Sequence, residues 1–223
     1  MMAVGNVGEY LAEYRDSDTF LSRDGGFTWE EIRKDAHLWE FGDSGSVLVM
    51  ANDEEPTDHV VYSLDEGISW HVYKFENDDK MRVRWITTVS TDTSRKFVLF
   101  GHHTNNPNRD IAVHVDFSQL TKTKCTCFVG TSCGIIADGV STGVMNPTDP
   151  NKDDFELWSP SEEREERCLF GRQVQYHRRI RNRNCFVGST LNKPVVAVSN
   201  CTCTRVDFEW YVTCSVRIVD ERC

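Results

Sequence analysis

The chain has 223 residues, nine cysteines and a formal net charge of −10, from 35 acidic and 25 basic side chains. An acidic surface lacks the positive field that attracts nucleic acids or anionic lipids, so we expect no nucleic-acid partner. The composition is that of a folded globular chain, and no apolar run of about 18 residues is present that could cross a bilayer.

Cysteine content and charge divide the chain into two parts. All nine cysteines lie from Cys125 onward, whereas residues 1–124 have none and carry 22 acidic against 13 basic side chains. Dense cysteines are typical of a disulfide framework in an oxidising compartment. The amino terminus nevertheless has no basic segment followed by an apolar stretch, so it is not a signal peptide. Either the thiols are reduced in a cytosolic protein, or the sequence is a piece of a longer chain.

Residues 1–124 predict a series of short strands. Brief apolar runs rich in β-branched and aromatic residues alternate there with Gly, Asp and Asn clusters, which is typical of strands bounded by turns. The segment Glu30–Leu38 is short and polar, and for it a helix is an alternative to strand structure. The predicted strands contain Val47–Met50, Val60–Tyr62, His71–Tyr73, Phe97–Phe100 and Ile111–Val113.

An internal repeat points to the architecture of this first part. The pattern Ser-x-Asp-x-Gly-x-(Thr/Ser)-Trp occurs twice at an offset of 41 residues. A period of 40 to 50 residues with several strands per unit indicates the blades of a β-propeller. The two copies comprise Ser22, Asp24, Gly26, Thr28 and Trp29, and Ser63, Asp65, Gly67, Ser69 and Trp70.

Each residue type of the repeat suits a hairpin turn. The Asp carboxylate can accept hydrogen bonds from N–H groups of the turn, and Gly can adopt a positive φ that other residues resist. The hydroxyl residues offer further local hydrogen bonds, and the Trp is expected to bury its ring against the blade. We therefore assign Asp24 and Asp65 structural roles, and we predict no catalytic residue.

The repeat resembles the Asp-box found on propeller blades of sialidases, some glycosidases and sorting receptors. A complete propeller needs at least four blades, and two boxes account for two to three. The resemblance implies that residues 1–124 are blades of a propeller that continues outside this sequence.

Residues 125–223 resemble the membrane-proximal cysteine-rich module of the sortilin family, which includes the fungal vacuolar sorting receptors for carboxypeptidase Y. The resemblance rests on the strings that span Asp153–Pro160, Cys168–Gln173 and Asn200–Glu209. It implies a mainly β fold, with a partial β-propeller formed by the last two to three blades in residues 1–124 and a small disulfide-rich module in residues 125–223.

The same resemblance implies a function. Such a receptor is not an enzyme and uses no cofactor. It binds a soluble vacuolar hydrolase such as carboxypeptidase Y on the lumenal side of Golgi and endosome membranes and carries it toward the vacuole. Signal peptide, membrane span and cytosolic tail would all lie outside this sequence, so any membrane attachment would come from those segments. No ligand-contacting residue is assigned.

Two segments depart from the family pattern. Residues 126–145 contain a single charged side chain, and residues 210–223 begin with Trp210 where the family would place a cysteine. We hypothesise that both segments are translated non-coding or aberrantly spliced sequence; the alternative is a genuine surface insertion, which loops tolerate well. Without them, the candidates for disulfide bonds are Cys125, Cys168, Cys185, Cys201 and Cys203.

Three further signals have alternative interpretations. The Cys-x-Cys pairs do not match the usual Cys-x₂₋₄-Cys spacing of zinc sites, so we predict disulfides and no metal. The five candidates and the cysteine expected at position 210 make six, which allow 15 pairings, so the connectivity stays open. The five arginines of Arg172–Arg183 could bind an acidic partner, but pairing with the glutamates of Glu162–Arg167 is the simpler expectation. Asn200 begins an Asn-x-Thr sequon and is a glycosylation candidate.

Functions of other classes stay open at this point. The Asp-boxes alone also fit a fragment of a glycosidase or sialidase, although residues 1–124 show no cluster of substrate-binding arginines with an acid pair. A purely structural extracellular module is a third alternative.

Overall fold

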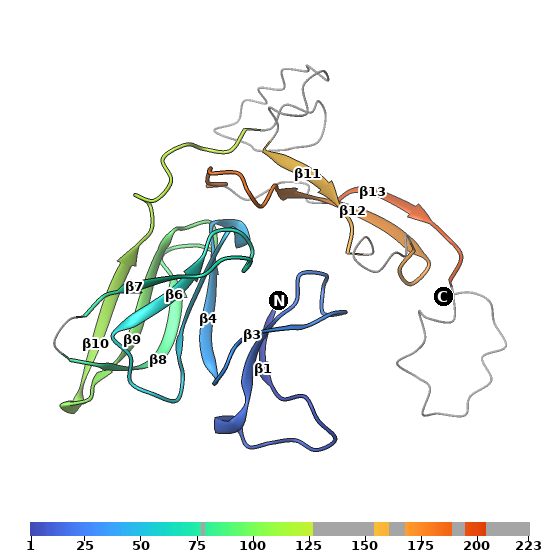
Figure 1. The fold of residues 1–223 in the computed structure, drawn as a ribbon. Helices are drawn as coiled ribbons and strands as arrows, with labels where there is room; N and C mark the ends of the chain where they lie inside the picture. The colour runs from blue at the N-terminus through green and yellow to red at the C-terminus, as the bar shows by residue number, and fades with distance from the viewer. Residues whose placement is uncertain (77–78, 127–153, 161–167, 189–194, 204–223) are drawn as a thin grey trace.

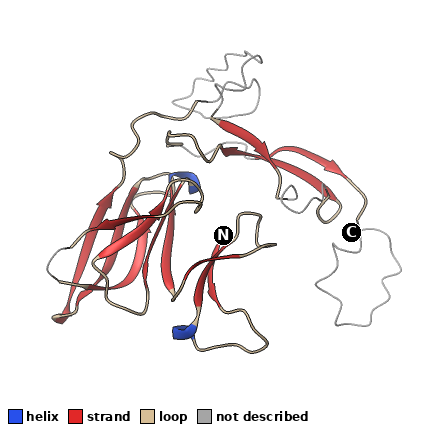
Figure 2. Cartoon of the chain, in the orientation of Figure 1, coloured by secondary structure: helices blue, strands red, loops and turns tan. Residues whose placement is uncertain are grey.

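Antiparallel sheets make up the fold in the computed structural model, which describes residues 1–76, 79–126, 154–160, 168–188 and 195–203 (Figure 1). These residues form four sheets, and their only helical elements are two single 3₁₀ turns, Tyr14–Asp16 and Asp43–Gly45 (Figure 2). The predicted mainly β fold is confirmed. The residues described contain no helix with the length and apolar character needed to cross a bilayer.

The first two sheets each contain one copy of the repeat. The first sheet has the strand order β1-β2-β3, and the second has the order β4-β5-β6-β7. Their strands are β1 (Met2–Gly5), β2 (Asp18–Leu21), β3 (Glu30–Arg33), β4 (His37–Gly42), β5 (Val47–Asn52), β6 (His59–Ser63) and β7 (His71–Lys74). One Asp-box connects β2 to β3 and the other connects β6 to β7, so β1–β3 correspond to β5–β7.

The segment Glu30–Leu38, for which the sequence did not exclude a helix, is extended. It contains β3 and the start of β4, and Asp35 between them has a φ of 67°. This left-handed residue ends one strand and starts the next. The five apolar runs predicted as strands lie within β5, β6, β7, β9 and β10, as expected.

The third and fourth sheets complete the described fold. The third has the order β10-β9-β8 and the fourth the order β11-β12-β13. Figure 1 shows the fourth sheet lying across one end of the stacked sheets. The strands are β8 (Met81–Thr88), β9 (Lys96–His103), β10 (Asn106–Asp116), β11 (Phe155–Trp158), β12 (Arg172–Arg179) and β13 (Val195–Asn200).

The second sheet has neighbours on both faces, and β5 is buried on both sides as a result. Successive residues of a strand point to opposite faces. Val49 belongs to the core shared with β8 and β9 of the third sheet, whereas Leu48 and Met50 belong to the core shared with Met2 and Leu21 of the first sheet. This double burial explains why Val47–Ala51 is continuously apolar instead of alternating.

Close approach between the first two sheets requires glycine in the second Asp-box. Gly67 has a φ of 82°, and a Cβ at this position would overlap the Cδ2 atom of Leu21 on β2. A side chain would therefore both strain the turn and push the sheets apart.

The two segments interpreted as departures from the family pattern fall almost entirely outside the described residues. Only Thr126 of residues 126–145 is described, and none of residues 210–223. The hypothesis that they are non-native sequence stays a prediction.

Candidate functional site

The first Asp-box turn is organised by one buried carboxylate. Asp24 Oδ1 accepts hydrogen bonds from the Ser22 hydroxyl at 2.8 Å and from the Phe27 N–H at 3.1 Å. Its Oδ2 accepts from the Thr28 N–H at 3.0 Å and the Thr28 hydroxyl at 2.7 Å. Ser22 in turn accepts from the Gly26 N–H at 2.7 Å. None of these partners lies more than four positions from Asp24 in the sequence, so the turn is held locally.

The second Asp-box repeats this arrangement. Asp65 Oδ1 accepts from the Ser63 hydroxyl at 2.8 Å, and both oxygens accept from Ser69, whose hydroxyl lies 2.5 Å from Oδ2. Ser63 accepts from the Gly67 N–H at 2.8 Å. The two turns thus hold equivalent side chains in equivalent positions on consecutive sheets.

The hydrogen bonds determine the charge of both carboxylates. Burial by itself raises the pKa of Asp24, but hydrogen bonds from Thr28, Ser22 and Phe27 outweigh it and bring the pKa below the ordinary value of 3.8. The pKa of Asp65 is lowered in the same way, against burial, by Ser69, Ser63 and Ile68. Both groups are therefore anionic acceptors at neutral pH, with their oxygens occupied inside their own turns.

The two box tryptophans differ in burial. Trp70 packs on the core between the first two sheets, and the Arg33 guanidinium lies 5.7 Å from its ring centre. Trp29, which was expected to be buried against its blade, keeps 42% of its surface exposed. Its indole Nε1 donates to the Gly26 carbonyl at 2.9 Å, which holds the ring over the turn and away from the core.

Arg23 connects the two boxes. Its Nε donates to the Glu66 carbonyl at 2.7 Å, and its Nη2 donates to the Gly67 carbonyl at 3.0 Å. Its Nη1 pairs with Glu30 at 2.6 Å. Because Arg23 belongs to the first box and Glu66 to the second, this side chain fixes the two turns side by side.

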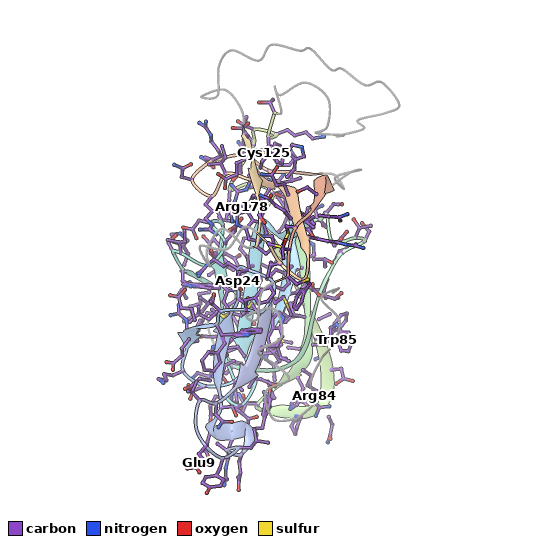
Figure 3. The ribbon with its side chains drawn as sticks, turned by 90° about the vertical axis from the view of Figure 1, so that its right-hand side faces the viewer. Glu9, Asp24, Arg84, Trp85, Cys125 and Arg178 are labelled. Carbon is purple, nitrogen blue, oxygen red and sulfur yellow. A yellow bond between two sulfur atoms is a disulfide. The ribbon has the colours of Figure 1, made fainter. Side chains whose placement is uncertain are left out.

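Glu66 also connects the second box to the fourth sheet, β11–β13, which we call the cysteine-rich sheet because it belongs to the cysteine-rich part of the chain. Its carboxylate accepts a hydrogen bond from Arg181 Nε at 2.6 Å and lies 3.9 Å from Arg178. Arg178 pairs with Glu156 on β11 at 2.7 Å and lies over the ring of Trp158, 4.8 Å from its centre. Figure 3 shows Arg178 between Asp24 and Cys125 along the long axis of the molecule.

Arg179 makes a second contact across the same junction. It is buried, and it donates to the carbonyl of Leu64 in the second box and to the carbonyl of Arg183. Arg178, the residue before it on β12, and Arg181, which follows the end of that strand, both reach Glu66. Three arginines of one segment therefore hold the second box.

Asp43 forms the third connection between the first part of the chain and the cysteine-rich part. It is buried in the turn between β4 and β5, with a φ of 51°. Its carboxylate accepts from the backbone N–H groups of Val187 at 2.9 Å and Gly188 at 2.6 Å, and also from the Ser46 hydroxyl. Nearby, the Arg95 guanidinium lies 3.9 Å from the ring centre of Phe186.

All five cysteines that the structure describes are disulfide-bonded. Cys125 pairs with Cys185 and Cys168 with Cys201, and Cys203 is also in a disulfide. The first bond lies in a small core with Phe155 and Val187. These sulfurs are not thiolates available to a metal ion. The other four cysteines lie outside the described residues.

A cavity of about 350 Å³ lies where the first, second and fourth sheets meet. Its walls are largely apolar, with Arg23, Glu66 and Arg178 among the polar residues that line it. The apolar lining includes Leu21, Phe41, Leu48, Trp158 and Tyr176.

Sequence reasoning missed the residues that join the two parts. The arginines of Arg172–Arg183 were expected to pair with the glutamates at 162–167, which lie outside the described residues. In the structure Arg178 and Arg181 pair with Glu66, a residue of the other part. Asp43 had a local signal as a turn residue between two apolar runs, but nothing in its neighbourhood predicted its distant partners.

Two family descriptions match consecutive stretches of the chain. "Sortilin-Vps10" (sortilin, neurotensin receptor 3) matches residues 1–86, and "Sortilin_C" (sortilin, neurotensin receptor 3, C-terminal) matches residues 88–220. The boundary between them falls within β8.

Curated fungal proteins named vacuolar protein sorting/targeting protein 10 are similar to nearly the whole chain. The protein of Laccaria bicolor is 57% identical over 209 residues, and that of Mycosarcoma maydis is 51% identical over 209 residues. The protein of Debaryomyces hansenii is 42% identical over 212 residues. Each alignment covers 94% of this chain but only 12–13% of the relative, so the chain spans about an eighth of their length. The description "Sortilin_C" alone matches more than half of the chain, and the two descriptions together match nearly all of it. The chain therefore belongs to the sortilin/Vps10 family.

Proposed function

We propose that this chain is part of the lumenal region of a sorting receptor that binds soluble vacuolar hydrolases, such as carboxypeptidase Y, and carries them from the Golgi toward endosome and vacuole. The relatives that support this proposal are named for vacuolar sorting and targeting. The receptor is not an enzyme in this proposal, and the Asp-box carboxylates act inside their own turns instead of on a substrate.

The main structural support for the proposal is that the second Asp-box turn contacts both the first box and the cysteine-rich sheet. Arg23 contacts Glu66 from one side, and Arg181 contacts it from the other. A receptor that must keep a cargo surface in one geometry needs its parts fixed relative to each other. We infer that this junction makes the two parts a single binding body.

We propose further that residues 1–124 are the last two to three blades of a β-propeller and that residues 125–223 are its cysteine-rich module. The face-to-face stacking of the first three sheets supports this arrangement. Trp85 and Phe100 are opposite each other on β8 and β9, and both are exposed on the face of the third sheet that points away from the shared core. In the full-length receptor another blade would cover this face.

The oxidising lumen also supports a proposal for Asn200. It is exposed at the end of β13, next to the disulfide-bonded Cys201. We propose that it carries an N-linked glycan, which Asn200→Gln would remove, seen as the loss of one glycan mass from the purified receptor. Asn182→Gln, at an exposed asparagine without a sequon, is the matched control.

The function is tested in fungal cells in which the gene for the full-length receptor is replaced by variants. Loss of the receptor should divert carboxypeptidase Y to the medium, and the wild-type gene should restore its delivery. A double variant, Glu66→Gln with Asp43→Asn, should secrete more of the enzyme than the wild type, because it loosens the junction. Asp110→Asn, at an exposed carboxylate on β10, is the control.

Normal vacuolar delivery of carboxypeptidase Y in the absence of the receptor would contradict the proposed function. Normal delivery by the double variant alone would contradict only the role given to the junction.

A further inference from the structure

An exposed apolar loop lies at the end of the first sheet remote from the cysteine-rich sheet. Residues 6–16 make up all but the last residue of the connection between β1 and β2. Figures 1 and 3 show this loop, with Glu9 near its tip, pointing away from Cys125. Val7, Tyr10 and Leu11 expose 89%, 79% and 95% of their surface. Single exposed apolar residues are ordinary, but three within five residues mark an interaction surface. We call residues 6–16 the β1–β2 loop.

Hydrogen bonds hold the β1–β2 loop in one shape. Asn6 Nδ2 donates to the Tyr10 carbonyl at 2.9 Å, which closes the segment that carries the apolar side chains. The Tyr14 hydroxyl donates to Asp53 at 2.6 Å and ties the loop to the turn after β5. A loop that is already ordered loses less conformational entropy when it binds a partner.

Carboxylates surround the apolar side chains. The loop contains Glu9, Glu13 and Asp16 against one cation, Arg15, which pairs with Glu13 at 2.7 Å. The turn that Tyr14 contacts adds an acidic run at 53–55. An anionic membrane would be repelled by this charge, whereas a protein segment with lysine or arginine beside an apolar side chain would be attracted.

We propose that the β1–β2 loop binds a segment of the cargo protein in which an apolar side chain is flanked by lysine or arginine. The apolar side chain is buried against Tyr10 and Leu11, and the cations lie near Glu9 and the acidic turn. The inference rests on the proposed function, because it names the chemistry of the cargo segment.

The test measures peptide affinity in the full-length receptor with a defined probe. The probe is a synthetic peptide of alternating leucine and lysine, with a leucine–glutamate peptide as its charge-reversed counterpart. The wild type should bind only the lysine peptide, and more weakly as salt screens the charges. Leu11→Ser should weaken binding about tenfold, the effect of losing a buried apolar contact. Glu9→Lys should also weaken binding.

The matched control is Ile68→Ser, which removes an exposed apolar side chain from the second Asp-box turn at the other end of the sheets. It should bind the lysine peptide as the wild type does. Leu11 is almost fully exposed, so Leu11→Ser should leave the thermal unfolding midpoint unchanged. If it lowers that midpoint, Tyr10→Ser takes its place in every comparison.

Three results would overturn the proposal. The first is unchanged affinity of Leu11→Ser for the lysine peptide, or an equal loss in Ile68→Ser. The second is equal binding of the two peptides by the wild type. The third is binding to phosphatidylserine vesicles that depends on Leu11 when peptide binding does not, because the loop would then be a membrane contact.

Carboxypeptidase Y, measured in the same assay, separates this inference from the proposed function. If the wild-type receptor does not bind the enzyme, the proposed function fails, and with it the assignment of the loop to cargo. If the wild type binds it and Leu11→Ser binds it equally well, the role of the loop fails while the proposed function stands. We expect about tenfold weaker binding by Leu11→Ser.

Discussion

Gly188 donates its backbone N–H to the Asp43 carboxylate at 2.6 Å, although 145 positions separate the two residues. The N–H of Val187 donates to the other carboxylate oxygen at 2.9 Å. The turn between β4 and β5 thereby receives the loop that follows Cys185. A buried anion that meets two N–H groups is satisfied only while the cysteine-rich part stays in place.

Replacement of Asp43 should therefore weaken the junction. Asp43→Ala leaves the N–H groups of Val187 and Gly188 without their acceptor, which should cost about 2–4 kcal/mol of unfolding free energy. Denaturant unfolding of the full-length receptor measures the loss, and hydrogen exchange of these two amides should become faster. Asp110→Ala is the control, and similar exchange rates in Asp43→Ala and wild type would contradict the assigned role.

The pair formed by Glu66 and Arg181 should show measurable coupling. Its side chains are partly buried, so its energy exceeds that of a fully exposed pair, and we expect an interaction term of about 1 kcal/mol. A double-mutant cycle with Glu66→Gln and Arg181→Met measures it in the unfolding of the full-length receptor. Additive effects of the two single changes would show that the contact contributes no stability. The exposed pair of Arg15 and Glu13 provides the comparison cycle.

The disulfide between Cys125 and Cys185 should be a major source of stability for the cysteine-rich part. It closes a loop of 60 residues, and loop-closure entropy predicts a loss of about 4 kcal/mol in the double variant with serine at both positions. Because Val187 follows Cys185 closely, the amide exchange of Val187 should increase together with the loss of stability. Unchanged exchange at this amide would mean that Asp43 holds the loop without help from the disulfide.

The Asp-boxes should resist the acidity of endosomes. The folded pKa values of Asp24 and Asp65 lie below the ordinary 3.8, so their stabilising contribution is complete above that value and is lost as the pH falls through the folded pKa. The difference in unfolding free energy between wild type and Asp24→Ala should be constant from pH 7 to about pH 5 and should shrink below about pH 4. A difference that already declines near pH 6 would contradict this.

His37 should make the fold pH-dependent in a higher range. Burial lowers the pKa of His37 below its ordinary 6.5, and the hydrogen bond to the Asp35 carbonyl opposes this only in part. Its Nδ1 lies 3.0 Å from that carbonyl oxygen and 3.2 Å from the Thr19 hydroxyl.

The sign of the His37 effect follows from proton binding. Between the folded pKa and 6.5 the unfolded chain binds more protons, so stability falls as the pH drops below 6.5. His37→Asn should flatten the fall of the unfolding midpoint that the wild type shows as the pH drops below 6.5. Parallel curves for wild type and His37→Asn would refute the prediction.

The local features of this protein could be predicted from its sequence. Each Asp-box is complete within eight residues, and the partners of Asp24 and Asp65 lie at most four positions away. Spacing alone therefore predicts a turn, and two copies at a fixed offset predict repeated sheets. Short apolar runs predicted strands for the same reason, because alternation and burial are local properties of a strand.

The pairing of cysteines and arginines was decided by the tertiary structure. The five candidate cysteines and the one that the family pattern would place at position 210 allowed 15 connectivities. The tertiary structure pairs Cys125 with Cys185, 60 positions away. Arg181 had glutamates nearby in sequence, yet it meets Glu66 across 115 positions. Stacking of the sheets creates such contacts, because it brings together turns and strands that are far apart in the sequence. The local sequence of one segment does not indicate which distant segment it will contact. The sequence by itself determined two repeated turns and a cysteine-rich segment, and the packing of four sheets decided how they are joined.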